Sequence, residues 1–263
     1  MTPEEAQAVD KVRSTFDELD CYRAQVQTPF VPKATSKLSR SDAAWTLLPA
    51  SQHVHASLAA AYDHLDLIRL TIEQRRGFAT ATYSVSRGAL LSASQALWLL
   101  AIDETDATRV ERGLMFSEEW YVQRIRWQEL MTPDLANADD AAKSGEQLRR
   151  FDEDLARLRS LRTTKARMNS TAIVEEAARM IHPDSPLLQR STVREWRRTG
   201  GDAHGLGWPL MTQSVVWGER GGDGLTGAVA EVDLVSLANA YLAAWLVLKR
   251  GFKEASEAAS AED

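Results

Sequence analysis

The sequence contains a single cysteine, Cys21, in 263 residues. One cysteine excludes an intrachain disulfide framework and a CxxC metal site. There is no Walker-type glycine loop, and Gly205 and Gly207 lack the preceding strand and third glycine of a dinucleotide site. Three histidines fall in one predicted helix, but no two are three or four residues apart, as metal ligands on one helix face would be. They are His53, His55 and His64. We therefore expect no metal and no cofactor.

The sequence also lacks a long apolar run and an excess of basic charge. The most apolar stretch, Ser86 to Ile102, is interrupted by polar residues and is too short for a membrane span. A net charge of −6 argues against a general nucleic-acid coat protein or a binder of anionic membranes. The start, Met1 to Glu5, lacks the basic and apolar residues of a secretory or mitochondrial signal. We therefore expect a soluble, cytoplasmic protein with no membrane partner.

Charge is unevenly distributed along the chain, and lysine is scarce. Residues 149–198 contain twelve Lys and Arg against seven Asp and Glu, so this region is net positive in an acidic protein. Only seven of the 31 basic residues are Lys, and Arg is the better residue for holding phosphate or carboxylate with two hydrogen bonds. Two interpretations remain open: a solvated helix face, which is the commoner case, and a site for a polyanion.

Apolar residues recur with a period of 3.6 in at least five segments, which predicts an all-α fold. We expect a single bundle of six or seven helices over residues 1–263. Its centre is predicted at two helices, 86–102 and 107–131, with Asp106 as the N-cap of the second. The first is apolar on almost every face and the second carries two apolar stripes, so both should be enclosed by other helices.

The N-terminal region is predicted to be one helix that begins with a capping box at Thr2. It carries a heptad-like seam, which packs either on the protein's own core or on a second copy, so a homodimer remains open. The seam residues are Val9, Val12, Phe16, Leu19 and Val26. Residues 28–50 are expected to form a long surface crossover, and the tail 254–263 is expected to fray.

Towards the C-terminus the pattern becomes less regular. A short helix is predicted over 172–181, and another begins with a capping box at Thr192. The Gly200–Gly201 pair is expected to stop or kink that second helix. The composition then changes to Val, Trp, Gly and Thr, and 215–232 is expected to form a β-hairpin.

The densest cluster of reactive side chains lies in residues 195–204. Arg197 and Arg198 precede His204, with six and five residues between them. An Arg can hold a phosphate by two parallel hydrogen bonds, and a His can transfer a proton near neutral pH. These groups suffice for cleavage of RNA without a metal, in which the 2′-hydroxyl attacks the adjacent phosphate.

This spacing of Arg and His in a helical bundle resembles the motif of HEPN-like nucleases. The resemblance extends to the Arg-bearing central helices and covers about half of the chain at the level of pattern. It implies a metal-independent endoribonuclease, or an inactive relative, of the kind linked to toxin–antitoxin or phage-defence systems. The catalytic residues it implies are His204, Arg197 and Arg198, and the binding residues are Arg87, Arg109, Arg112 and Asp202.

The sequence departs from the family at two points, of which the first is that the residue after either Arg is Arg198 or Thr199, not the usual acidic or amide residue. In HEPN-like nucleases the Arg and the His share one helical face, whereas the Gly200–Gly201 pair should separate them here. A structural role is also open for the central arginines, because an Arg buried in a bundle needs a carboxylate partner such as Asp103 or Glu118.

Two other functions remain open. A helix-turn-helix unit over 171–199 would bind DNA, although the expected joining segment of about eleven residues exceeds the usual three to four. A non-catalytic scaffold would instead bind a protein partner, with tryptophan side chains at the interface. The candidates outside regular helix are Trp45, Trp208 and Trp217.

Overall fold

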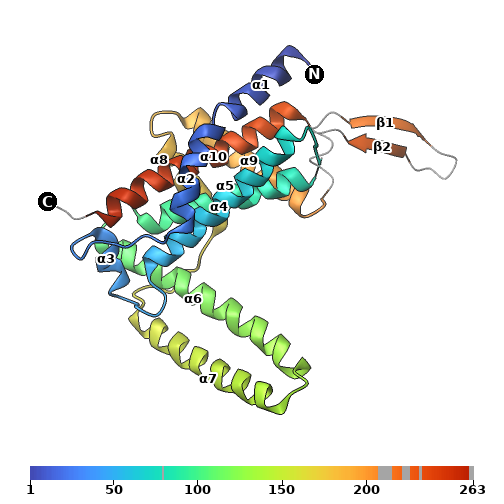
Figure 1. The fold of residues 1–263 in the computed structure, drawn as a ribbon. Helices are drawn as coiled ribbons and strands as arrows, with labels where there is room; N and C mark the ends of the chain where they lie inside the picture. Colours follow the sequence, from blue (N-terminus) through green and yellow to red (C-terminus); the bar gives the residue numbers. More distant parts are fainter. Residues whose placement is uncertain (79, 207–214, 221–225, 231–232, 261–263) are drawn as a thin grey trace. The chain divides into compact units, whose positions relative to one another are not determined.

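The computed structural model describes residues 1–78, 80–206, 215–220, 226–230 and 233–260, without the side chains of the two segments between 215 and 230. Helix dominates (Figure 1), which confirms the all-α class. No helix in the described ranges is long and apolar enough to cross a membrane.

The chain forms two compact units, each assembled from stretches far apart in the sequence. Unit 1 comprises Met1–Pro29, Val54–Trp98 and Ser170–Ser256; unit 2 comprises Phe30–His53, Leu99–Asn169 and Glu257–Asp263. The single domain over 1–263 stays a prediction.

Unit 1 is built from helices whose apolar faces meet in a core of fully buried residues such as Leu19, Leu65, Leu97 and Tyr241. It contains α1 (Pro3–Arg13), α2 (Phe16–Gln27), α8 (Ser170–Ile181), α9 (Pro186–Ala203), and the greater part of α4 (Ala50–Glu73), α5 (Ala81–Leu100) and α10 (Leu234–Ala259). Each of α4 and α8 covers a segment in which the sequence predicts a helix.

The predicted N-terminal helix is divided into α1 and α2. The capping box at Thr2 is present. The break comes at Ser14 and Thr15, whose hydroxyls donate to the carbonyls of Lys11 and Val12 over 2.8 and 2.7 Å. Such bonds let Ser and Thr compete with the helical backbone. This break, together with a helix inside the predicted crossover, raises the helix count above six or seven.

The predicted seam packs within unit 1. Val12, Phe16 and Leu19 are all buried. The Phe16 ring meets the Tyr241 ring edge-on, with the centroids 6.5 Å apart. These contacts favour the own-core interpretation of the seam, and a homodimer stays a prediction.

Unit 2 is dominated by two neighbouring helices, α6 (Asp106–Met131) and α7 (Ala138–Leu161), linked by the 3₁₀ turn η1 (Thr132–Asp134) (Figure 1). The predicted N-cap of α6 is off by one residue: the Thr105 hydroxyl accepts from the amide of Thr108 over 3.2 Å. Asp106 instead bonds to Arg40 Nε over 2.7 Å and to Arg109.

The crossover 28–50 contains a short helix, α3 (Lys37–Asp42), capped by Ser36. Trp45, a proposed interface residue, is only 7% exposed and belongs to a buried cluster. Its ring meets the Tyr121 ring edge-on at 6.3 Å. Trp45 is therefore a core residue. Trp208 and the side chain of Trp217 lie outside the described residues.

Residues 254–259 are helical rather than frayed, because α10 extends to Ala259. The Ala259 carbonyl accepts a hydrogen bond from the amide of Lys33 over 2.9 Å. In the segment where a hairpin is expected, β1 (Val215–Arg220) and β2 (Thr226–Ala230) pair antiparallel, with Val216 opposite Val229.

The connection between α8 and α9 is four residues long, not about eleven. The prediction was wrong because α9 begins at Pro186 instead of Thr192. Ser185 caps the helix by accepting from the amide of Leu188, and Pro186 occupies its first turn, where a missing N–H costs nothing. Thr192 lies inside the helix, and its hydroxyl donates to the Leu188 carbonyl.

Truncation of core leucines tests the burial in each unit. Leu97 in unit 1 is 0% exposed and Leu114 in unit 2 is 3% exposed. We expect Leu97→Ala and Leu114→Ala each to lower the free energy of unfolding by ~2–5 kcal/mol, through lost burial and a residual cavity. Chemical denaturation measures this loss; a change below about 0.5 kcal/mol, typical of exposed positions, would contradict the packing.

His53 makes unit 2 sensitive to acid. Its ring is buried, with Nε2 lying 2.8 Å from the Ser117 hydroxyl and the ring centroid 4.8 Å from that of Phe116. Burial lowers the pKa of His53 to about 4, against 6.5 for an exposed histidine. The unfolded chain therefore takes up a proton at a pH where the folded chain does not.

Stability should consequently fall as the pH falls from 6.5 towards 4. From the two pKa values, protonation of His53 in the unfolded chain lowers the free energy of unfolding by about 2 kcal/mol when the pH falls from 7 to 5. Urea denaturation at both pH values should show a smaller difference for His53→Gln than for the wild type. An equal difference in the two proteins would refute the assignment.

Candidate functional site

Helix α9 carries most of the predicted site residues, and it does not stop at Gly200–Gly201. It continues to Ala203, with His204 as the C-cap residue, whose amide donates to the Gly200 carbonyl over 3.1 Å. Arg197 and His204 are both exposed. Seven residues are nearly two full helical turns, so the two side chains leave α9 on the same side, about 10 Å apart along its axis.

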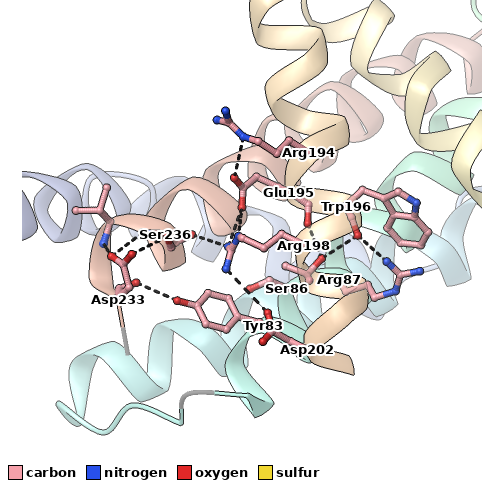
Figure 2. Close-up of polar contacts among 12 residues, drawn as sticks. Tyr83, Ser86, Arg87, Arg194, Glu195, Trp196, Arg198, Asp202, Asp233 and Ser236 are labelled. Carbon is pink, nitrogen blue, oxygen red and sulfur yellow. Dashed lines mark hydrogen bonds and ion pairs between the residues drawn. The ribbon is translucent and has the colours of Figure 1, made fainter. Parts of the chain in front are cut away.

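The helix tolerates Gly200 because another side chain occupies the space beside it. A Cβ at this position would lie 2.6 Å from Nη1 of Arg87, which projects from α5. That nitrogen donates to the Trp196 carbonyl over 2.7 Å, and the guanidinium carbon lies 3.3 Å from the Trp196 ring centroid (Figure 2). The absence of a side chain at Gly200 therefore lets the Arg87 guanidinium approach the helix closely. The expectation of a helix break was wrong.

Arg198, the next residue of α9, is buried. Its Nε and Nη2 donate to the Glu195 carboxylate over 3.0 and 2.7 Å, and Nη2 also donates to the Ser236 carbonyl over 3.1 Å (Figure 2). Nη1 lies 4.0 Å from the carboxylate of Asp202, which is also buried. Burial lowers the pKa of Arg198, but the charge and hydrogen bonds of Glu195 outweigh it, so the net shift is upward and the side chain stays charged.

Tyr83 on α5 completes this buried cluster. The Arg198 guanidinium carbon lies 4.3 Å from its ring centroid, and the tyrosine hydroxyl donates to the Asp233 carbonyl over 3.1 Å. Burial raises the pKa of Tyr83 to about 12, so the phenol is neutral at physiological pH. The Asp233 carboxylate caps α10 by accepting from the amides of Val235 and Ser236. The cluster therefore joins α5, α9 and the start of α10.

A groove of about 720 Å³ lies beside this cluster in unit 1. Residues of α8, α9 and α10 line it, including five arginines and two glutamates. The arginines are Arg179, Arg190, Arg194, Arg197 and Arg198. Because Glu195 neutralises Arg198, four arginines face a single further carboxylate, that of Glu175. Such a surface attracts anions, and guanidinium groups suit phosphate in particular.

Three of these arginines were not singled out from the sequence. Arg179 comes from α8, and Arg190 and Arg194 precede Arg197 on α9. Positions 190, 194 and 197 follow the four- and three-residue steps of one helix face. This spacing is visible in the sequence, but it indicates one helix face only if α9 is known to begin at Pro186.

The predicted binding residues are not brought together in one unit. Arg87 and Asp202 lie in unit 1, whereas Arg109 and Arg112 lie in unit 2. Arg109 is buried and donates to the Leu100 carbonyl over 2.8 Å, besides its pairing with Asp106. Arg112 lies 3.8 Å from Glu104. Arg87 and Arg109 thus make structural contacts, Arg87 with the Trp196 carbonyl and Arg109 with Asp106 instead of Asp103 or Glu118.

His204 is not among the residues that line the groove. It lies past the end of α9, whereas the groove extends from Gln189 to Arg198 along that helix. Of the three predicted catalytic residues, Arg197 and His204 are exposed and Arg198 is buried. In the described residues, no group of three or more His, Cys, Asp or Glu is placed to hold a metal ion.

No family model matches the chain, and no match was found among curated proteins or solved structures. The geometry of the site is therefore the basis for any functional proposal.

The contact between Arg87 and Gly200 can be tested by a double-mutant cycle. Gly200→Ala should raise helix propensity by about 1 kcal/mol, but in the wild type its methyl group must displace Arg87 from the Trp196 carbonyl. We therefore expect Gly200→Ala to be about 1–2 kcal/mol less favourable in the wild type than in an Arg87→Ala background. Unfolding free energies of the four proteins give the coupling. Additive effects would contradict the contact.

Proposed function

We propose that unit 1 binds RNA along the arginine-lined groove and cleaves it beside the end of α9 without using a metal ion. Arg197 binds the scissile phosphate, and His204 transfers the proton. The observation that carries the proposal is the continuity of α9, which leaves both side chains exposed on one side of the helix. This arrangement removes the main departure from the HEPN-like motif.

In this reaction the 2′-oxygen forms a bond to phosphorus and the bond to the 5′-oxygen breaks. The products are a 2′,3′-cyclic phosphate and a 5′-hydroxyl. The His204 imidazole accepts the proton of the 2′-hydroxyl and returns a proton to the leaving 5′-oxygen, so no further reactant is needed. Arg197 stabilises the negative charge that develops on the phosphate oxygens.

Arg198 is not assigned a catalytic role. Its Nε and Nη2 are already bonded to Glu195 and the Ser236 carbonyl. Moving it to a phosphate would leave Glu195 buried without its partner, which is costly. Arg179, Arg190 and Arg194 instead supply charge for the RNA backbone on either side of the cleavage point, so binding should weaken steeply with salt.

Purified protein should cleave single-stranded RNA in the presence of EDTA and leave 2′,3′-cyclic phosphate ends. His204→Ala and Arg197→Ala should each lower the rate by about 10²–10⁴-fold, the usual contribution of a positioned acid or base. His182→Ala is the matched control, because His182 lies in the turn before α9 and outside the groove lining. The rate is measured by gel or mass spectrometry of a defined oligonucleotide.

Equal activity of the His204→Ala variant would rule out the proposed mechanism. Salt-dependent RNA binding without cleavage, weakened by Arg190→Ala and Arg194→Ala, would instead identify an inactive relative. The same titration with duplex DNA tests a second candidate, supported by the four-residue connection between α8 and α9, which is typical of a helix-turn-helix. Preference for duplex DNA over RNA would favour that candidate.

A further inference from the structure

Unit 2 contains a second groove, of about 570 Å³, with its own group of cations. One wall is a face of α6, where Met115, Glu118, Val122 and Arg126 recur at helical spacing. The other wall is the segment that follows α7, from Arg162 to Met168, together with Arg159 at the end of that helix.

The segment after α7 is held in place by a partly buried ionic network. The Arg162 side chain is only 6% exposed and pairs with both Glu111 and Glu118 of α6. The Thr163 amide and the Thr164 hydroxyl each donate to the Glu111 carboxylate over 2.8 Å. Burial raises the pKa of Glu111, but these bonds outweigh it and the net shift is downward, so the network is intact at neutral pH.

This network accounts for the position of the segment, but the other basic side chains of the groove take no part in it. Lys165 and Arg167 lie next to the anchored residues, and Arg126 lies across the groove on α6. All three are exposed, and none has an ion-pair or hydrogen-bond partner for its side chain within the described part of the chain. The lining contains five basic residues and two glutamates, so the groove has a net positive charge.

The same groove has an apolar part. Met115, Val122 and Met168 contribute side chains to its lining. Its volume falls within the range of small-molecule sites, which combine apolar walls with a few placed polar groups. A flat apolar ring system fits such a wall, and methionine adapts well to ring contacts.

We propose that this groove binds a nucleoside polyphosphate, with Arg126, Lys165 and Arg167 on the phosphates and the base against Met115, Val122 and Met168. Three unpaired cations match a triphosphate better than a single phosphate. Because the ionic network already holds the segment that carries Lys165 and Arg167, less conformational entropy is lost when a ligand binds. This site is separate from the RNA groove of unit 1 and does not depend on cleavage there.

Isothermal titration calorimetry of the full chain, at physiological salt, tests the proposal with ATP, GTP, AMP and inorganic tripolyphosphate. The triphosphates should bind more tightly than AMP. The double variant Lys165→Ala/Arg167→Ala should weaken ATP binding by about tenfold or more, the equivalent of 1.4 kcal/mol. Lys143→Ala is the control, because that exposed lysine of α7 lies outside the groove and its loss should leave binding unchanged.

A second variant separates the nucleoside from the phosphates. Met168→Ser should weaken ATP and GTP but leave tripolyphosphate unaffected, and far-ultraviolet circular dichroism should show that both variants remain folded. Absence of triphosphate binding, or binding that the double variant does not change, would overturn the site. Tighter binding of tripolyphosphate than of ATP, or displacement of ATP by a lower concentration of single-stranded RNA, would overturn the nucleotide assignment.

Discussion

The buried pair of Arg198 and Glu195 determines which side chains of α9 are buried in unit 1 and which are exposed. Two charges placed below the surface are costly unless other contacts compensate them. Here the Ser236 carbonyl of α10 accepts from Arg198, and the Tyr83 ring of α5 lies against its guanidinium. Among the described residues, Nη1 makes no hydrogen bond and lies 4.0 Å from the Asp202 carboxylate. This requirement fixes the rotation of α9 about its axis. Because adjacent residues on a helix point about 100° apart, burying Arg198 leaves Arg197 exposed. The division between the buried Arg198 and the exposed Arg197, which we propose as the phosphate ligand, follows from this one contact.

Much of the helical fold could be predicted from the sequence, because apolar periodicity reports which face of a helix is buried. It identified α4 and α8 and the central pair α5 and α6. Helix ends were harder. The choice between Thr105 and Asp106 as the cap of α6 depends on which of two adjacent polar side chains reaches an amide, and both residue types are good caps. Hydroxyls that break a helix, as at Ser14 and Thr15, also cannot be told from solvated ones in the sequence.

The larger errors had tertiary causes. Gly200 and Gly201 appear as a helix stop by propensity alone, and the reason for Gly200 is a guanidinium from α5, more than a hundred residues earlier. The sequence before α9 has the composition of a turn, which concealed the start at Pro186. The candidate site was partly predictable: Arg197 and His204 were named, but choosing between Arg197 and Arg198 required the packing of α5 and α10. The groove of unit 2 was missed because its walls are about 40 residues apart in sequence.

The discontinuity of the two units has a consequence for synthesis on the ribosome. Most of unit 2 has emerged once residue 169 is made, since only its last few residues, Glu257–Asp263, come later. Unit 1 begins with Met1–Pro29 but needs Ser170–Ser256 to bury the apolar faces of α4 and α5. Its earliest helices must therefore wait, with exposed apolar surface, until Ser170–Ser256 have been translated. Chains in this state are prone to aggregate, so the order of the segments makes the N-terminal half dependent on prompt completion of the C-terminal helix.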